Sequence, residues 1–174
     1  MIDFQSIVGK TADEISTLSP FPVGAYVGVI TQVAHLQTSK NHTDCIAFGV
    51  KPVEVIEASY EELEEFGDWQ NYEFKPMAMV SPLTFFMTSE AAASFLIATN
   101  RKTKERSGFL VDVCQLPSSV LNSGLPVWAE DENGAPMDSL CLSAVGSMIE
   151  FTVGHKISES GRTYAVIKTV SRHQ

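Results

Sequence analysis

The clearest alternation of apolar and polar positions lies in the C-terminal quarter of the chain. Every second position of Ser147–Ile157 is apolar from Ile149 to Val153, with polar side chains between them. A second β-rich run, Arg162–Val170, follows after the turn-forming residues Ser158–Gly161. Period-two alternation and a short loop that contains glycine predict an antiparallel hairpin with one apolar face.

The second run of this hairpin alternates less regularly. Apolar Val166 and Val170 share a face with Lys168, while Ile167 falls on the opposite face. Apolar side chains on both faces are typical of a strand that is covered on both sides, which is what we expect here.

A long hairpin is also predicted nearer the N-terminal end. Gly24–Leu36 and Asp44–Ile56 are rich in β-branched residues and are separated by a polar loop. Gly28 marks a position where the first strand can bend, a device that helps to close small barrels. Pro52 cannot donate a backbone hydrogen bond, so it predicts an edge or an end of the second strand.

Four further segments have weaker β signals. Asn71–Val80 and Gly108–Gln115 are predicted as strands, and Pro76 would place the first of them at an edge. Val127–Ala129 and Leu140–Leu142 lie on either side of an Asn-Gly turn signal and are expected to form short strands.

Three segments predict helices. Thr88–Asn100 is rich in alanine and has Ser89 and Glu90 near its start, so it is predicted as the main helix. Thr11–Leu18 and Ser59–Phe66 begin with capping-box spacing, and they predict two short helices.

Length and composition are typical of one globular domain. The chain has 174 residues, of which 44% are hydrophobic and 19% charged. Its apolar runs are far shorter than the ~20 residues of a membrane helix, and Asp3 stands where a signal peptide carries positive charge. Cys45, Cys114 and Cys141 lie far apart and predict no disulfide framework. We therefore expect a cytoplasmic protein with reduced thiols and no membrane span.

The charge is unevenly distributed along the chain. The formal net charge is −9, which is unusual for a protein that binds phosphates. The segment Glu54–Glu73 holds eight of the 21 acidic residues and no lysine or arginine. Arg101–Arg106 has four basic residues and one acidic residue. An acidic molecule can therefore still present a basic patch.

The sequence contains no arrangement typical of an enzyme or a metal centre. Gly9-Lys10-Thr11 is similar to the end of a phosphate-binding loop, but Phe4 stands where that loop needs its first glycine. His42 and Cys45 would supply only two of the ligands that zinc requires. The chain has no Gly-x-Ser-x-Gly nucleophile motif. We expect neither catalysis nor a bound metal or cofactor.

Basic and aromatic residues form the remaining candidate site. Single-stranded nucleic acid is bound by lysine and arginine along a groove and by stacking of bases on exposed aromatic rings. The candidates for phosphate contacts are Arg101, Lys102, Lys104, Arg106, Lys40, Lys156, Arg162 and Lys168. The candidates for stacking are Tyr26, Tyr164 and Trp128, with Phe48 and Trp69 as further aromatic residues.

The order of several features resembles a family of phage proteins. The features are a strand that opens with Pro22-Val23-Gly24-Ala25-Tyr26, a Phe85-Phe86-Met87-Thr88 lead into an alanine-rich segment, and a final hairpin with Ile149-x-Phe151-x-Val153 and Gly161-Arg162-x-Tyr164. In these features the chain is similar to small phage-encoded OB-fold-like proteins that bind single-stranded DNA. It differs from them in its acidity, in the insertion 101–140 and in ending without an acidic tail.

The resemblance implies a β-rich fold (all-β or α+β), an OB-like small barrel of about five strands with one main helix and two short helices. Residues 1–174 would form one domain, with 1–20 as a helical extension. The implied function is non-catalytic binding of single-stranded DNA in phage replication, recombination or transcription, in the host cytoplasm. A phage or host polymerase is a candidate protein partner, and a homo-oligomer is left open.

Two other functions remain open from the residues alone. A protein-interaction module could dock on a polymerase or another partner through the acidic Glu54–Glu73 segment or the barrel face, and the net charge favours this. An enzyme or ligand-binding barrel would need a deep pocket with converging polar side chains.

Overall fold

The computed structural model describes residues 20–117 and 139–174, and the predicted helix Thr11–Leu18 and strand Val127–Ala129 lie outside them. Within the described residues, five strands form one antiparallel sheet in the order β3-β2-β1-β6-β7. The strands are β1 (Gly24–Gln37), β2 (Asp44–Ala58), β3 (Thr84–Phe86), β6 (Met148–Ile157) and β7 (Thr163–Arg172). The predicted β-rich class is therefore confirmed.

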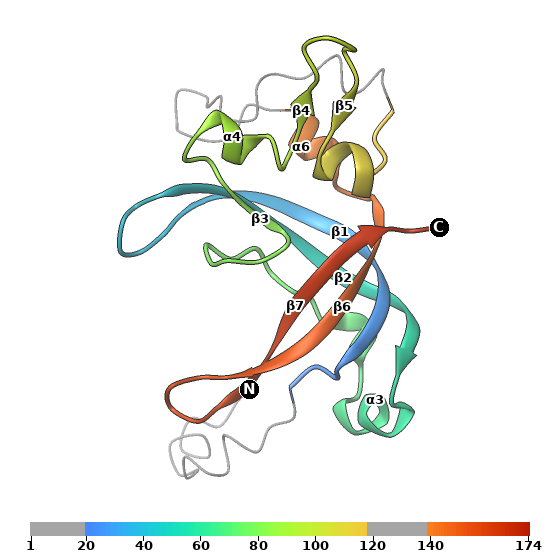
Figure 1. Cartoon of the computed structure of the whole chain (residues 1–174). Helices are drawn as coiled ribbons and strands as arrows, with labels where there is room; N and C mark the ends of the chain where they lie inside the picture. The colour runs from blue at the N-terminus through green and yellow to red at the C-terminus, as the bar shows by residue number, and fades with distance from the viewer. Residues whose placement is uncertain (1–19, 118–138) are drawn as a thin grey trace.

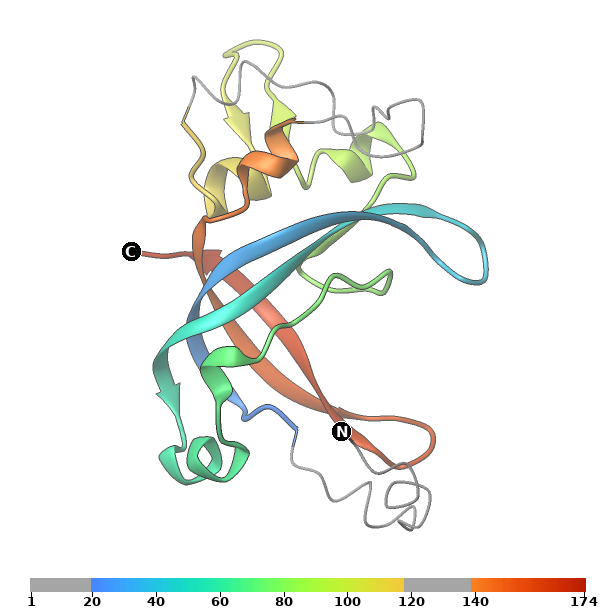
Figure 2. The same ribbon diagram turned by 180° about the vertical axis from the view of Figure 1, so that it is seen from behind.

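Both predicted hairpins form. β1 pairs with β2 from Gly24 to Gln37, and β6 pairs with β7 around the turn 158–161, where Gly161 adopts a positive φ of 84°. β1 also pairs with β6 from Gly24 to Val29, which joins the two hairpins into one curved sheet (Figures 1 and 2).

The sheet stays open between its two edge strands, β3 and β7. The segment predicted as the strand Asn71–Val80 is irregular, which corrects that prediction. It follows the 3-10 turn Trp69–Asn71, and only Phe74 pairs with β2, through Val50. Pro76, which lacks an N–H group, cannot continue a ladder. The predicted small barrel is therefore present as an open, curved sheet.

Gly28 and Pro52 occupy positions that their chemistry explains. A Cβ atom at Gly28 would lie 2.6 Å from Phe151 Cε1 and 2.7 Å from a methyl group of Val50, so a larger residue would collide with the core. Pro52 lies two residues after Val50, whose N–H donates outward to Phe74. Because the backbone N–H groups of alternate residues in a strand point to the same side, the nitrogen of Pro52 also points to the outer edge of β2, as predicted.

A β-bulge corrects the predicted faces of β7. Val153 pairs with Ile167 and Phe151 pairs with Val170, so β7 contains one extra residue, Lys168, between these pairs. The bulge returns Val170 to the face of Ile167, and both pack against the core. Lys168 is exposed. β7 is therefore covered on one face rather than on both.

The acidic helix α3 (Tyr60–Phe66) forms as predicted. The Ser59 side chain accepts a hydrogen bond from the Glu62 N–H, and Gly67 ends the helix with φ 69°.

The predicted main helix Thr88–Asn100 is wrong. Only α4 (Glu90–Ala93) is helical, and β4 (Ala98–Thr99) then pairs with β5 (Arg106–Ser107). The carbonyl groups of Phe95 and Leu96 accept hydrogen bonds from the N–H groups of Phe109 and Leu110. These tertiary bonds replace those of a helix and draw Leu96 fully into the core.

The strand predictions for Gly108–Gln115 and Leu140–Leu142 are also wrong. The first segment forms the π-helical turn η2 (Phe109–Val113), and the second lies in helix α6 (Ser139–Ser143). Together with α4, β4 and β5 they lie over one end of the curved sheet (Figure 1). Their buried side chains join the sheet residues in one core cluster, which includes Tyr26, Ile30, Phe48, Leu96, Phe109, Leu110, Cys141 and Phe151.

The Tyr26 hydroxyl and the Cys114 thiol are buried groups with raised pKa values, and they make the free energy of unfolding depend on pH in the alkaline range. Tyr26 is 0% exposed and donates its hydroxyl to Pro22 O at 2.8 Å. Burial, followed by the charge of Glu62, raises the pKa of Tyr26 from 10.0 to about 12. Burial also raises the pKa of the Cys114 thiol from 9.0 to about 12. Both groups stay protonated in the folded chain at pH values where the unfolded chain ionises.

We therefore expect the free energy of unfolding to fall as pH rises from about 9 towards 12, because unfolding then releases protons. Urea denaturation at about pH 8 and about pH 11 measures this fall. The double variant Tyr26→Phe/Cys114→Ala should show a smaller fall than the wild type, although it starts less stable. An equal fall in both proteins would contradict this assignment.

Candidate nucleic-acid interface

An aromatic ring and two lysines share the outward face of the β6–β7 hairpin. Lys156 pairs with Tyr164, and Gly154 pairs with Val166. The opposite face carries Val153 into the core. We call the outward positions Lys156, Tyr164, Val166 and Lys168 the hairpin face.

Gly154 makes room for one of these lysines. A Cβ atom at position 154 would lie 2.7 Å from Cε and 2.9 Å from Cγ of Lys168. The aliphatic part of Lys168 therefore crosses Gly154, and the bulge at residue 168 directs it there. The glycine and the bulge together hold this ammonium group beside the strand that carries Lys156.

Tyr164 is accessible for stacking. Its side chain lies beside Lys156 on the neighbouring strand, and the residue is 37% exposed. Neighbouring residues of antiparallel strands have Cβ atoms about 5 Å apart, so the ring and the lysine can contact the same ligand.

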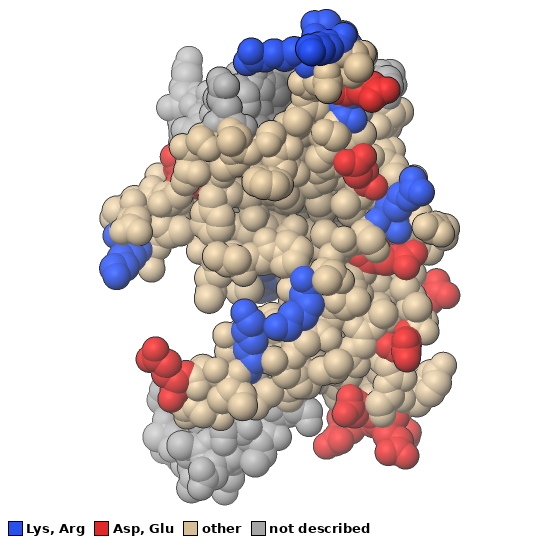
Figure 3. Space-filling view, in the orientation of Figure 1, with Lys and Arg blue, Asp and Glu red and all other residues tan. Residues whose placement is uncertain are grey.

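The charges of the hairpin face are not neutralised within the described part of the chain. No carboxylate there lies within 4.0 Å of Lys156, Lys168 or the nearby Arg162. Figure 3 shows basic side chains at a hollow between the ends of the β1–β2 and β6–β7 hairpins, while acidic side chains gather around α3 at the lower right. The net charge of −9 therefore does not describe this surface.

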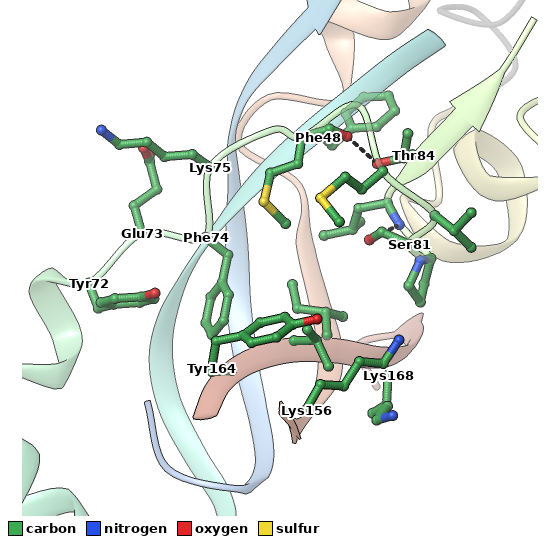
Figure 4. Close-up of a pocket in the computed structure, with 18 residues that line it drawn as sticks. Phe48, Tyr72, Glu73, Phe74, Lys75, Ser81, Thr84, Lys156, Tyr164 and Lys168 are labelled. Atoms are coloured by element: carbon green, nitrogen blue, oxygen red, sulfur yellow. Dashed lines mark hydrogen bonds between the residues drawn. The ribbon is translucent and has the colours of Figure 1, made fainter. Parts of the chain in front are cut away.

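A cavity of about 920 Å³ adjoins the hairpin face, and we call it the edge cavity. Its two walls are β7 and the irregular segment 72–84, so it lies along the open side of the sheet (Figure 4). Lys156, Tyr164 and Lys168 line it together with apolar side chains. The apolar side chains that line it include Phe48, Phe74, Met77, Met79, Val80 and Ile167.

The other predicted basic residues are not all brought together. Lys40 is exposed on the β1–β2 turn. Arg101, Lys102 and Lys104 are exposed on the β4–β5 turn, at the opposite end of the molecule from the β6–β7 turn (Figures 1 and 2). Arg106 is half-buried in β5 and is engaged in an interaction of its own. The structure therefore separates two basic surfaces that the sequence treats as one path.

The predicted stacking residues have different outcomes. Tyr26 is fully buried and its ring stacks on Phe151, with the centroids 5.7 Å apart, so its assignment as a base-stacking residue is wrong. Phe48 is also buried, and Trp69 is half-buried. Trp128 lies outside the described residues. Tyr164 is the predicted stacking residue that the structure leaves accessible.

The sequence predictions missed the apolar wall of the edge cavity. Met77, Met79 and Val80 are exposed there, in the segment that the sequence predicts as an edge strand. The spacing of Pro76 and Pro82 around these residues is the one available signal, because prolines at both ends disfavour a regular strand.

Other kinds of site find no support in the described residues. They contain no group of three or more His, Cys, Asp or Glu residues that could hold a metal ion. Cys45, Cys114 and Cys141 are buried and form no disulfide with one another. No helix within residues 20–117 and 139–174 has the length and apolar character needed to cross a membrane.

Comparison of the chain with protein-family models, with curated proteins and with solved structures finds no match. The geometry of the hairpin face and the edge cavity is therefore the basis for a functional assignment.

Proposed function

We propose that this protein binds single-stranded DNA on the hairpin face, without catalysis. A base stacks on Tyr164, and the nearby Lys156 and Lys168 contact phosphates. Arg162 at the neighbouring turn extends the contacts, and Lys40 lies across the hollow. The observation that carries the proposal is an exposed aromatic ring beside two lysines that have no carboxylate partner in the described residues.

The arrangement matches the physical requirements of binding without sequence preference. Stacking on an aromatic ring tolerates any base, because every base has a π-face. Lysine contacts to phosphates carry no sequence information. The acidic side chains around α3 disfavour phosphates on that part of the surface.

Fluorescence anisotropy with a labelled oligothymidylate of about 16 nucleotides tests the proposal. Titrations at about 50 mM and about 200 mM salt should show weaker binding at the higher concentration, with a slope of log K against log [salt] of roughly −0.7 per phosphate contact. Three to four contacts predict a slope of about −2 to −3. Absence of binding at the lower salt concentration would overturn the proposal, and salt-independent binding would remove the phosphate contacts from it.

A further inference from the structure

The outer edge of β7 has no partner in the described structure. β7 is the last strand of the sheet, and it has ten residues, Thr163–Arg172. Among the described residues, no backbone hydrogen bond connects this strand to any element on its outer side. Alternate residues of an edge strand direct their N–H and C=O groups outward, where these groups can form hydrogen bonds with a further strand.

The edge cavity lies beside this open edge and has a fixed opposite wall. Phe74 exchanges two backbone hydrogen bonds with Val50 of β2, at 2.8 and 3.0 Å. The Thr84 hydroxyl donates to Met77 O at 2.9 Å (Figure 4). These contacts anchor the wall at two points, so the cavity has the position that a strand closing the sheet would occupy.

The walls of the cavity expose large apolar side chains to solvent, which is unfavourable. Met79 is 60% exposed and Val80 is 91% exposed on the opposite wall. The inner face of β7 contributes Ala165 and Ile167. Adjoining exposed apolar side chains mark interaction sites, and methionine adapts to the shape of different partners.

Charge decides which partner fits this cavity. Lys156 and Lys168 line it, and no carboxylate lies within 4.0 Å of either within the described residues. Glu73, also at the cavity, accepts a hydrogen bond from Gln32 at 3.0 Å. Lys75 extends away from the cavity (Figure 4). Lys156 and Lys168 therefore place positive charge on the outward face of the β6–β7 hairpin, next to the open edge of β7.

We propose that the edge cavity is a docking site for an extended segment of another protein, added as a strand to β7. Acidic side chains of this segment alternate with aliphatic ones. The aliphatic side chains enter the cavity beside Ile167, and the acidic ones lie outward beside Lys156 and Lys168. At about 3.3 Å per residue, a segment of about six to eight residues pairs with most of the ten-residue strand. The inference goes beyond DNA binding and does not require it.

Binding of a synthetic peptide to the full chain tests the composition of this partner. The probe is a fluorescein-labelled octapeptide that alternates glutamate with valine, and its control replaces each glutamate with lysine. We expect saturable binding of the glutamate peptide, and at least tenfold weaker binding of the lysine peptide. The variant Lys156→Gln/Lys168→Gln should reduce this preference, whereas Lys102→Gln/Lys104→Gln should not. No binding of the glutamate peptide, or equal binding of both peptides, would overturn the proposal.

Backbone methylation tests strand addition itself. Two versions of the glutamate peptide carry N-methyl groups at alternate residues, one set at odd and the other at even positions. One version loses the N–H groups that face β7 and should bind at least tenfold more weakly than the other, because each lost hydrogen bond lowers affinity. Equal affinity of the two versions would contradict pairing with β7.

Oligothymidylate added to the same assay separates this inference from the proposed function. Because both ligands use Lys156 and Lys168, the oligonucleotide should displace the peptide. A protein that binds the oligonucleotide but not the peptide overturns the docking site and leaves DNA binding in place. A protein that binds the peptide but not the oligonucleotide supports the docking site and overturns DNA binding.

Discussion

Replacing Tyr164 with alanine is expected to weaken binding of single-stranded DNA by about 1–3 kcal/mol, the range that loss of one base–aromatic stack produces. The affinity for oligothymidylate should therefore fall roughly 5- to 150-fold. The slope of log K against log [salt] should change little, because the tyrosine carries no charge. Anisotropy titrations of the wild type and the variant measure both quantities.

Tyr164→Phe is the matched control for this prediction. It keeps the ring and removes the hydroxyl, so it should retain most of the affinity. The residue is 37% exposed and belongs to an edge strand, so neither variant should abolish folding, which circular dichroism can verify. Equal affinity of the alanine variant and the wild type would show that no base stacks here.

The second large effect is expected from the two lysines of the hairpin face. Lys156→Gln/Lys168→Gln should make the slope of log K against log [salt] less steep by about 1.4, because each lost phosphate contact on a single strand contributes about 0.7. Affinity at low salt should fall roughly tenfold, the equivalent of about 1.4 kcal/mol. Titrations at several salt concentrations give both values.

Lys102→Gln/Lys104→Gln removes the same number of charges at the other end of the molecule. Both lysines are exposed on the β4–β5 turn, so the substitution leaves the core intact. It should change the affinity and the slope by less than the substitutions in the hairpin face. If the two double variants have equal effects, the contribution of charge to binding does not depend on the hairpin face.

The sequence predicts the two long hairpins well because their pairing depends on local alternation and turn residues. Ile149, Phe151 and Val153 are buried as the period-two pattern requires. The bulge at Lys168 disturbs the alternation of β7, but the same irregular pattern is typical of a strand covered on both sides, so the pattern alone does not identify the bulge. The segment Thr88–Asn100 is mispredicted for another reason: the carbonyl groups of Phe95 and Leu96 accept hydrogen bonds from Phe109 and Leu110 instead of from residues of a helix.

The sequence identifies several residues of the candidate site, but it does not predict how the fold brings them together. Lys156, Tyr164 and Lys168 are recognised from the sequence as basic and aromatic residues of the final hairpin. The burial of Tyr26 follows from packing against Phe21 and Phe151, which a single strand cannot reveal. The edge cavity is not predicted either, because it exists only where segment 72–84 approaches β7.

The charge distribution limits where a nucleic acid can bind. The acidic residues of α3 and the basic residues of the hairpin face occupy different parts of the surface (Figure 3). A uniform charge of −9 would repel DNA from every side, whereas this separation leaves basic surfaces such as the hairpin face attractive at short range. Binding should therefore be weak at high salt and directed away from α3.

Photochemical cross-linking tests the central claim, that single-stranded DNA binds on the hairpin face, most directly. An oligothymidylate with iodouracil at one position reacts on irradiation with aromatic side chains in contact with that base. Mass spectrometry of the digested adduct should identify Tyr164 as the main cross-linked residue in the wild type, and the adduct at this position should disappear in Tyr164→Ala. Cross-links confined to residues 90–117, with none in β6 or β7, would contradict the account.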